Sequence, residues 1–182
     1  MDDVVGIVLA AGAGRRFGRP KALVEYQGER LVDRAVRLLR DGGCDPVLVV
    51  AGAAPLTVAG ATVVDNPAWE EGMGSSVRAA LSVARAAAAV LVPVDTPYLG
   101  PDAVRRLIAA YHAGAAVAAA TYGGERGHPV LIAADHWAAV AATATGDVGA
   151  RVFLRQHPEL VTPVPCDGTG RPDDVDTPDT LV

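Results

Sequence analysis

Apolar and polar residues follow one another along the chain in blocks that predict alternating buried strands and amphipathic helices. Segments 4–11, 46–52 and 89–95 are almost continuously apolar, which is typical of strands buried on both faces of a sheet. Segment 29–43 instead places leucine, valine and alanine on one side of a helix and mainly arginine on the other, and two glycines end it. This alternation indicates an α/β fold.

Three further segments extend this order toward the middle of the chain. Segment 61–67 predicts a short strand, and segment 75–88 predicts a helix for which Ser75 or Ser76 is the N-cap. Segment 100–114 predicts another helix, because its apolar residues recur with helical spacing and a proline stands in the first turn.

From residue 115 onward the blocks become shorter. Segment 115–133 predicts two short strands around a glycine-containing loop, 136–144 and 147–157 predict short helices, and 160–165 predicts a strand. The complete order predicts a three-layer α/β/α fold with a mostly parallel, Rossmann-like sheet and a small β-hairpin excursion in the C-terminal half. No repeat or low-complexity linker interrupts the chain, so we expect one domain over 1–182, with ligands beyond the carboxyl ends of the strands.

Composition narrows the class of protein. Apolar residues make up 51% of the 182 residues and aromatic residues only 4%, so the core is expected to be aliphatic. The net charge of −5 argues against a general affinity for nucleic acid. Two cysteines form neither a disulfide framework nor a metal-ligand spacing, and no signal peptide or membrane-spanning stretch is apparent. We therefore expect a cytoplasmic protein with no membrane partner.

The segment LAAGAGRRFGRPKAL at 9–23 has the chemistry of a phosphate-binding loop but matches neither standard glycine-rich fingerprint. A Rossmann fingerprint would need glycine where Phe17 stands, and a Walker A loop would need serine or threonine after a Gly-Lys pair. Glycines let backbone N–H groups approach an anion, and no acidic residue lies between Asp3 and Glu25. The alternative is a tight turn with a solvated basic rim. The loop's cations are Arg15, Arg16, Arg19 and Lys21.

Carboxylates stand at the ends of two predicted strands. Asp95 ends segment 89–95, and a strand bearing Val175 would place Asp174 and Asp176 on one face, with Thr177-Pro178 starting a final helix. Oxygen ligands of this kind suit Mg²⁺, which binds through one or two carboxylates and substrate phosphates. Asp95 and the acids of the C-terminal pair, Asp174 and Asp176, are therefore candidate metal ligands. The alternative is that these acids only cap turns or are solvated.

Six motifs, in this order, carry a resemblance to a known family: LAAGAGRRFGRPKAL, NPAWEEGMGSSVRAAL, LVPVDTP, GHPVL, GDVGAR and DVDTPDTL. The chain resembles the molybdenum-cofactor nucleotidyltransferases of the GT-A-like nucleotidyltransferase superfamily, and most closely the molybdopterin cytidylyltransferase branch. The resemblance covers essentially the whole chain. It implies a GT-A-like sheet with a nucleotide-binding part at about 1–100 and an acceptor-binding part at about 101–182.

The resemblance also implies residue roles. It gives Leu9, Ala10, Ala11 and Gly12 as the nucleotide-holding turn and Arg15, Arg16 and Lys21 as triphosphate contacts. It also implies that Asp95 and Asp176 carry Mg²⁺ and that Lys21 and Arg15 act in catalysis beside them. Asn66, Gly74, Ser75 and Ser76 would lie beside the base and ribose. Gly127, His128, Pro129, Gly146 and Asp147 would face the second substrate, although His128 could equally be structural and Asp147 a helix cap. Packing is the default role of Trp69, Tyr98 and Tyr122.

The implied reaction is Mg²⁺-dependent transfer of a nucleotidyl group from a nucleoside triphosphate to phosphorylated molybdopterin, with release of pyrophosphate. A molybdoenzyme or its maturation factor would be the protein partner. Thr96 after Asp95 resembles guanylyltransferase members, whereas Ala13 between two glycines favours CTP over GTP. The alternatives are a sugar 1-phosphate or other small phosphorylated acceptor, a non-catalytic nucleotide-binding chaperone, and an α/β domain with an incidental basic loop.

Overall fold

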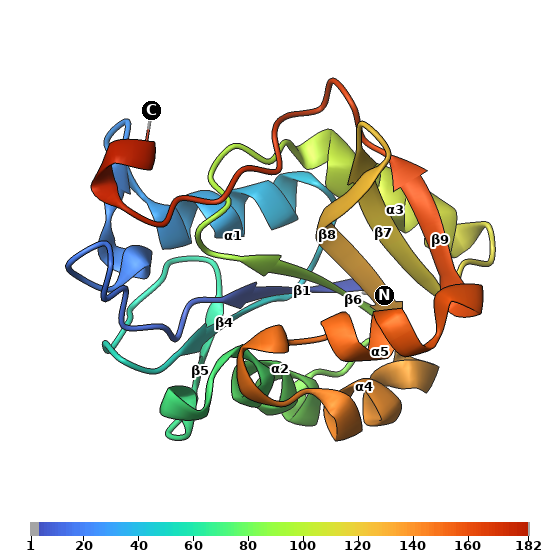
Figure 1. Ribbon diagram of the computed structural model, residues 1–182, viewed down its shortest axis with the longest axis horizontal. Coiled ribbons are helices and arrows are strands. Elements are labelled where there is room, and N and C mark those ends of the chain that lie inside the picture. Colours follow the sequence, from blue (N-terminus) through green and yellow to red (C-terminus); the bar gives the residue numbers. More distant parts are fainter. Residues whose placement is uncertain (1–3, 182) are drawn as a thin grey trace.

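The computed structural model describes residues 4–181, which form a seven-stranded sheet covered by helices on both faces. Figure 1 shows α1 and α3 on one side of the sheet and α2, α4 and α5 on the other. Within the described residues, no helix has the length and apolar character needed to cross a membrane. The helices are α1 (Leu31–Asp41), α2 (Met73–Val83), α3 (Pro101–His112), α4 (Trp137–Thr143) and α5 (Arg151–Gln156).

The strand order of the sheet is β5-β4-β1-β6-β8-β7-β9. Strand β8 runs antiparallel to both of its neighbours, and the other neighbouring pairs are parallel. A separate two-stranded hairpin is formed by β2 (Glu25–Tyr26) and β3 (Glu29–Arg30). The strands of the sheet are β1 (Val4–Leu9), β4 (Val47–Ala51), β5 (Thr62–Asp65), β6 (Ala88–Pro93), β7 (Val117–Tyr122), β8 (Glu125–Ala133) and β9 (Val161–Pro165).

Alternate residues of the central strands build two separate cores. Along β1, Val4 and Val8 pack beneath α1 and α3, whereas Val5, Ile7 and Leu9 pack against α2 and α4 on the opposite face. The whole of β1 is buried because both of its faces are covered by helices. The continuous apolar runs in the sequence therefore correspond to central strands, as predicted.

The carboxyl ends of the central strands meet at one edge and position the site. Leu9 and Pro93 are paired at the ends of β1 and β6, and the N–H of Val94 donates to the carbonyl of Leu9 at 3.0 Å. Ala51 and Asp65 are paired likewise at the ends of β4 and β5. The basic loop after β1 consequently lies beside the segment that carries Asp95, at the edge where ligands bind in such sheets.

The structure confirms the predicted fold class, with corrections in the second helix. Segment 75–88 was predicted to be helical throughout, but α2 begins earlier and ends at Val83. The prediction that Ser75 or Ser76 caps the helix is wrong, because Gly72 is the N-cap and both serines are buried inside the first turns. The last predicted residue, Ala88, instead pairs with Val4 of β1, and this burial in the sheet outweighs alanine's helix preference.

Two other predicted elements differ. The helix predicted over 147–157 is split into a 3₁₀ turn, Gly146–Val148, and α5, because Gly149 adopts a positive φ of 55° between them. The strand predicted around Val175 does not form. That segment is irregular, and its anchor is the buried Val175 side chain, packed with Val24 and Leu31. The final predicted helix is a single 3₁₀ turn, Pro178–Thr180.

Candidate functional site

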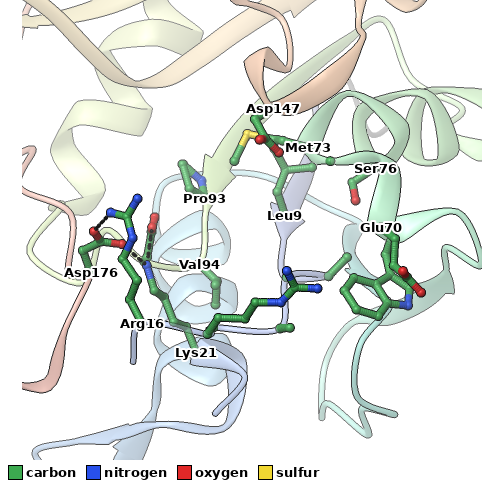
Figure 2. Close-up of a pocket in the computed structure, with 18 residues that line it drawn as sticks. Leu9, Arg16, Lys21, Glu70, Met73, Ser76, Pro93, Val94, Asp147 and Asp176 are labelled. Atoms are coloured by element: carbon green, nitrogen blue, oxygen red, sulfur yellow. Dashed lines mark hydrogen bonds and ion pairs between the residues drawn. The ribbon is translucent and has the colours of Figure 1, made fainter. Parts of the chain in front are cut away.

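A pocket of about 470 Å³ opens at the carboxyl edge of the sheet. Figure 2 shows its opposite ends, with Arg16, Lys21 and Asp176 at one end and Glu70 and Ser76 at the other. The pocket receives side chains from the loop after β1, the turn before α2, the end of β6 and the C-terminal segment. Its lining consists of Leu9, Ala11, Gly12, Ala13, Gly14, Arg15, Arg16, Lys21, Trp69, Glu70, Gly72, Met73, Ser76, Pro93, Val94, Asp95, Asp147 and Asp176.

Lys21 joins the two predicted metal-ligating carboxylates. Its Nζ lies 3.1 Å from Oδ2 of Asp95 and 3.5 Å from Oδ1 of Asp176. Arg16 donates a short hydrogen bond to Asp176 as well. These residues come from three separate parts of the chain, and the N–H of Val175 donates to the carbonyl of Asp95 at 2.8 Å, which fastens the C-terminal segment beside β6. We call this group of Arg16, Lys21, Asp95 and Asp176 the charged end of the pocket.

The two carboxylates lie in different electrostatic environments. Burial raises the pKa of Asp95 above its ordinary value, and the nearby Lys21 ammonium only partly offsets this effect. The hydrogen bond from Arg16 lowers the pKa of Asp176, which is far more exposed. Both groups therefore have a cationic partner. Together they form a set of hard oxygen donors at one point of the pocket.

The shape of the basic loop depends on Gly14. This residue has a φ of +64°, and a Cβ there would collide with the carbonyl of Arg19. The N–H of Gly18 donates to the carbonyl of Gly14 at 2.8 Å and closes the turn. A Cβ at Gly12 would meet nothing within 4 Å, because its space opens into the pocket. The loop therefore folds back on itself and presents Arg15, Arg16 and Lys21 to the pocket.

Asn66, Ser75 and Ser76 form a buried hydrogen-bond network beside the pocket. The amide nitrogen of Asn66 donates to the hydroxyls of Ser75 at 2.9 Å and Ser76 at 3.0 Å. Its amide oxygen accepts from the N–H of Ala68 at 3.0 Å. Ser75 in turn donates to backbone carbonyls on either side of the turn before α2. The network braces this turn, and only Ser76 among the three lines the pocket.

The predicted acceptor segment around His128 lies outside the pocket lining. Its peptide bond to Pro129 is cis, and its carbonyl accepts from the Tyr122 hydroxyl at 2.8 Å. Burial, together with the positive charge of Arg151, lowers the pKa of His128 to about 4, although Asp174 opposes this effect. The side chain is therefore a packed, neutral imidazole at ordinary pH.

The structure brings together part of the set of residues predicted from the sequence. Those that line the pocket are Leu9, Ala11, Gly12, Arg15, Arg16, Lys21, Ser76, Asp95, Asp147 and Asp176. Those that are not in the lining are Ala10, Asn66, Gly74, Ser75, Gly127, His128, Pro129 and Gly146. Gly74 has a packing role, because a Cβ there would approach the carbonyl carbon of Ala144 to 2.6 Å. No group of three or more His, Cys, Asp or Glu side chains suited to a metal occurs within 4–181.

Sequence reasoning missed the 3₁₀ turn at Trp69–Glu71 as part of the site. Both Trp69 and Glu70 line the pocket, and Trp69 packs so closely over Gly52 that a Cβ on this glycine would come within 2.5 Å of it. The available signal was an aromatic residue and two acids placed directly before Gly72, at the end of a strand and the start of a helix. Because only 4% of the residues are aromatic, a tryptophan beside two acids at the carboxyl edge of the sheet indicates a candidate ligand-contacting position.

Comparison with protein families confirms the resemblance found in the sequence. The model of the MobA-like NTP transferase domain matches residues 6–161. The solved structure of Rv0371c from Mycobacterium tuberculosis H37Rv superposes with a TM-score of 0.84 at 28% identity, covering 98% of this chain and 95% of that one. The structure of Rv0371c in complex with manganese gives 0.81 at 28% identity, covering 97% and 95%.

Two curated relatives carry different names. Nicotine blue oxidoreductase of Paenarthrobacter nicotinovorans is 41% identical over 189 residues, covering 96% of this chain and 92% of that protein. Molybdenum cofactor guanylyltransferase of Rhodobacter capsulatus is 38% identical over 113 residues, covering 59% of this chain and 58% of that protein. The match to the second relative thus spans little more than half of either protein. On the match over 6–161, this chain belongs to the MobA-like NTP transferase domain family of nucleotidyltransferases.

Proposed function

We propose that this protein transfers a nucleotidyl group from GTP or CTP to a phosphorylated small-molecule acceptor, with molybdopterin as the favoured acceptor. A phosphate oxygen of the acceptor attacks the α-phosphorus, the bond between the α-phosphorus and its bridging oxygen breaks, and pyrophosphate leaves with that oxygen. The acceptor phosphate is already ionised near neutral pH, so the reaction needs no general base. The residues that support the proposal are those of the charged end of the pocket.

The single observation that carries this proposal is the convergence of Asp95 and Asp176 on Lys21 at the mouth of a glycine-rich basic loop. A loop that only turned the chain would not need two carboxylates, one from the segment after β6 and one from the C-terminal segment, to meet beside it. Cations suited to outer phosphates and carboxylates suited to a metal stand side by side here. Transfer at a phosphate requires both, because the cations stabilise charge on the leaving group and the metal stabilises charge on the reacting phosphate.

The donor set fits a divalent cation. Two carboxylates from separate elements reach one position, and a hard cation such as Mg²⁺ takes carboxylate ligands and completes its coordination with water and phosphate oxygens. Bound there, the ion would polarise the α-phosphate and offset its charge. The manganese complex of Rv0371c supports a divalent-metal site in this family. We propose Asp95 and Asp176 as the ligands.

The remaining steps belong to the chain's own side chains. Lys21 and Arg15 bind the β- and γ-phosphates and offset the charge that develops on departing pyrophosphate. The exposed backbone of Gly12 lets N–H groups of the loop approach the phosphates closely. Asp147, which lines the pocket between its two ends, faces the acceptor in this proposal. Apart from Asp176, the residues proposed to hold the nucleotide lie within about 1–100, and Asp147, proposed for the acceptor, lies within about 101–182.

Pyrophosphate release tests the proposal directly. The purified protein is incubated with GTP or CTP, Mg²⁺ and candidate acceptors: phosphorylated molybdopterin, sugar 1-phosphates and other small phosphorylated metabolites. We expect release only with triphosphate, metal and acceptor together. Nucleotide binding without release under any acceptor would instead favour a non-catalytic chaperone. An absence of Mg²⁺-dependent nucleotide binding would overturn the proposal.

A second candidate function is redox chemistry, because the relative that is 41% identical over nearly the whole chain is named an oxidoreductase. Both cysteines are free and buried, and burial raises the pKa of Cys44 to about 12, so neither supplies a dithiol couple. Electrons would therefore come from a bound carrier such as a pyridine dinucleotide, whose pyrophosphate suits the same basic loop. Oxidation of NADH or NADPH by a dye acceptor, with no pyrophosphate release from triphosphates, would establish this alternative.

A further inference from the structure

The end of the pocket away from Lys21 has its own chemistry. Glu70 and Ser76 lie at this end, whereas Arg16 and Lys21 lie at the opposite end (Figure 2). Trp69 also lines the pocket and belongs to the same 3₁₀ turn as Glu70. A triphosphate held by the charged end would extend its nucleoside toward these residues. What this end recognises therefore decides which base the protein accepts. This assignment of the nucleoside to the far end of the pocket rests on the proposed function.

The polar groups nearest to this end are mostly engaged with one another. Asn66 uses its amide nitrogen on Ser75 and Ser76 and its amide oxygen on the N–H of Ala68. All three side chains are buried, with 3–4% of their surface exposed. Reading a base with Asn66 or Ser75 would break this network and leave buried polar atoms without partners. The base must be read by another group.

Glu70 is the remaining acidic or amide side chain at this end, since Ser76 also lines the pocket but its hydroxyl already accepts from Asn66. Glu70 lines the pocket and is exposed, and its carboxylate has no hydrogen-bond or ion-pair partner among residues 4–181. The adjacent Glu71 is different, because it is absent from the lining and lies 3.6 Å from Arg78 on α2. The 3₁₀ turn thus directs one acid into the pocket and pairs the other with a helix. A free carboxylate facing a ligand accepts hydrogen bonds and cannot donate them.

Trp69 supplies a flat surface next to this carboxylate. The indole is partly buried and packs against the second core, and its Cβ and Cγ lie directly over Gly52. A Cβ at Gly52 would approach these atoms to 2.5 and 2.7 Å, so the glycine is what permits this placement. A tryptophan fixed at its base and open to the pocket provides a stacking surface for a planar ring.

We propose that Trp69 and Glu70 form a nucleobase subsite that selects guanine. The indole stacks on the ring, and the two carboxylate oxygens of Glu70 accept from N1–H and the 2-amino group of the same edge. Cytosine, adenine and uracil do not present two adjacent donors on one edge. The 2-amino-4-oxo pyrimidine edge is also present in a pterin, so the same pair could bind the acceptor ring instead. Guanine is the favoured source, because the nucleoside extends from phosphates bound at the charged end.

Binding of GTP, CTP and inosine triphosphate in the presence of Mg²⁺ tests the role of Glu70. Inosine lacks only the 2-amino group of guanosine. We expect wild type to prefer GTP over CTP and over inosine triphosphate by about tenfold or more, the scale of a two-point hydrogen bond. Glu70→Gln should reduce both preferences to within about threefold. Glu71→Gln is the matched control, since it makes the same change one residue away, and should keep both preferences.

Tryptophan fluorescence tests the stacking separately. The chain has two tryptophans, and the other one, Trp137, lies in α4 and donates to the carbonyl of Ile132 at 2.9 Å. The variant Trp137→Phe leaves Trp69 as the reporter, and we expect GTP to quench it. Trp69→Leu should weaken GTP and CTP alike by about tenfold, because stacking does not distinguish bases. Unchanged affinities in Trp69→Leu would contradict the stacking.

A pterin added as competitor shows whether the subsite binds the guanine ring of GTP or the pterin ring of the acceptor. If GTP and CTP bind equally but pterin quenches Trp69 in a way that Glu70→Gln abolishes, the subsite is supported with the acceptor as its ligand. If triphosphates bind to wild type while no preference and no pterin binding depends on Glu70, the subsite is overturned and the proposed function stands. If no triphosphate binds to wild type, both proposals fall.

Discussion

The charged end of the pocket and the network around Asn66 differ in how they use polar side chains. At the charged end, Lys21 bridges the carboxylates of Asp95 and Asp176, whose side chains are 24% and 45% exposed. A ligand can therefore reach these groups and replace the contacts that they make with one another. In the network, each polar atom of Asn66 is already bound to a neighbour and no more than 4% of any member is exposed. One region can contact substrate, while the other holds the turn in place.

This difference separates residues that the family resemblance treats alike. The resemblance implies ligand contacts for Asn66, Ser75 and His128 as it does for Lys21 and Asp95, yet the structure places the first three in packing positions outside the pocket lining. Variants at the charged end should change turnover and leave stability nearly unchanged. Variants at the packing positions Asn66, Ser75 and His128 should lower stability and leave turnover nearly unchanged. Four substitutions test this contrast, beginning with the largest expected effect.

Asp95→Asn should lower the rate of pyrophosphate release by about 10³-fold, because it removes one of the two proposed metal ligands. Stability should hardly fall, since burial already raises the pKa of this carboxyl and so disfavours its ionised form. Steady-state turnover and a thermal melt measure the two effects. Asp102→Asn, which changes an exposed acid paired with Arg105 on α3, is the matched control. Turnover within threefold of wild type would exclude Asp95 as a ligand.

Lys21→Met should slow transfer by about 10²-fold, because it removes the ammonium that offsets charge on the leaving pyrophosphate. Lys21 is the chain's only lysine, so a lysine-specific label that GTP protects against would report on this position alone. Arg19→Met removes a cation from the same loop at a position outside the pocket lining, and its rate should stay within a few-fold of wild type. Equal losses in both variants would point to the overall charge of the loop rather than to Lys21.

The sequence reveals the fold and the charged end because both depend on local patterns. Continuous apolar runs identify β1 and β6, and a loop with four cations and no acid predicts a phosphate site. Asp176 was predicted by its motif, but the strand expected around Val175 was wrong because a single buried valine anchors that segment against Val24 and Leu31. This contact joins residues far apart in the sequence, and the periodicity of apolar residues along the chain does not predict such contacts.

The alanine-rich run before β6 shows a second limit. Residues 84–88 fit a helix as well as a strand, and pairing of Ala88 with Val4 decides the outcome. The roles of Asn66 and Ser75 were likewise not predictable, because a motif records which side chains are present and not whether they bond to one another. Trp69 and Glu70 gave a weaker signal for the same reason. Their position in the pocket depends on the space that Gly52 leaves.

Asn66→Ala should destabilise the fold by about 2–3 kcal/mol, because it removes the buried amide that bonds to the hydroxyls of Ser75 and Ser76 and leaves the N–H of Ala68 without its acceptor. Urea unfolding at pH 7.5 measures the loss. At a temperature where the variant is folded, its affinity for GTP should remain within about threefold of wild type. Asp65→Ala, at the exposed end of β5, is the neighbouring control and should have little effect on stability. A variant of normal stability with a large loss of affinity would place Asn66 in the ligand-contacting region.

The smallest effect concerns the pH dependence of stability at His128. The folded protein holds the pKa of this imidazole at about 4, below the ordinary 6.5, so the unfolded chain takes up the proton first as the pH falls. Stability from this residue is therefore complete above about pH 6.5 and declines toward pH 4, by on the order of 2 kcal/mol at pH 4.5. Urea unfolding of wild type and His128→Gln at pH 7.5 and 4.5 isolates the contribution of His128 to the free energy of unfolding. The carboxylates contribute equally to both proteins, so they cancel in the comparison. The variant should lose less stability between the two pH values than wild type does. Equal losses would mean that the imidazole titrates freely, and His128 would then join the residues available to a ligand.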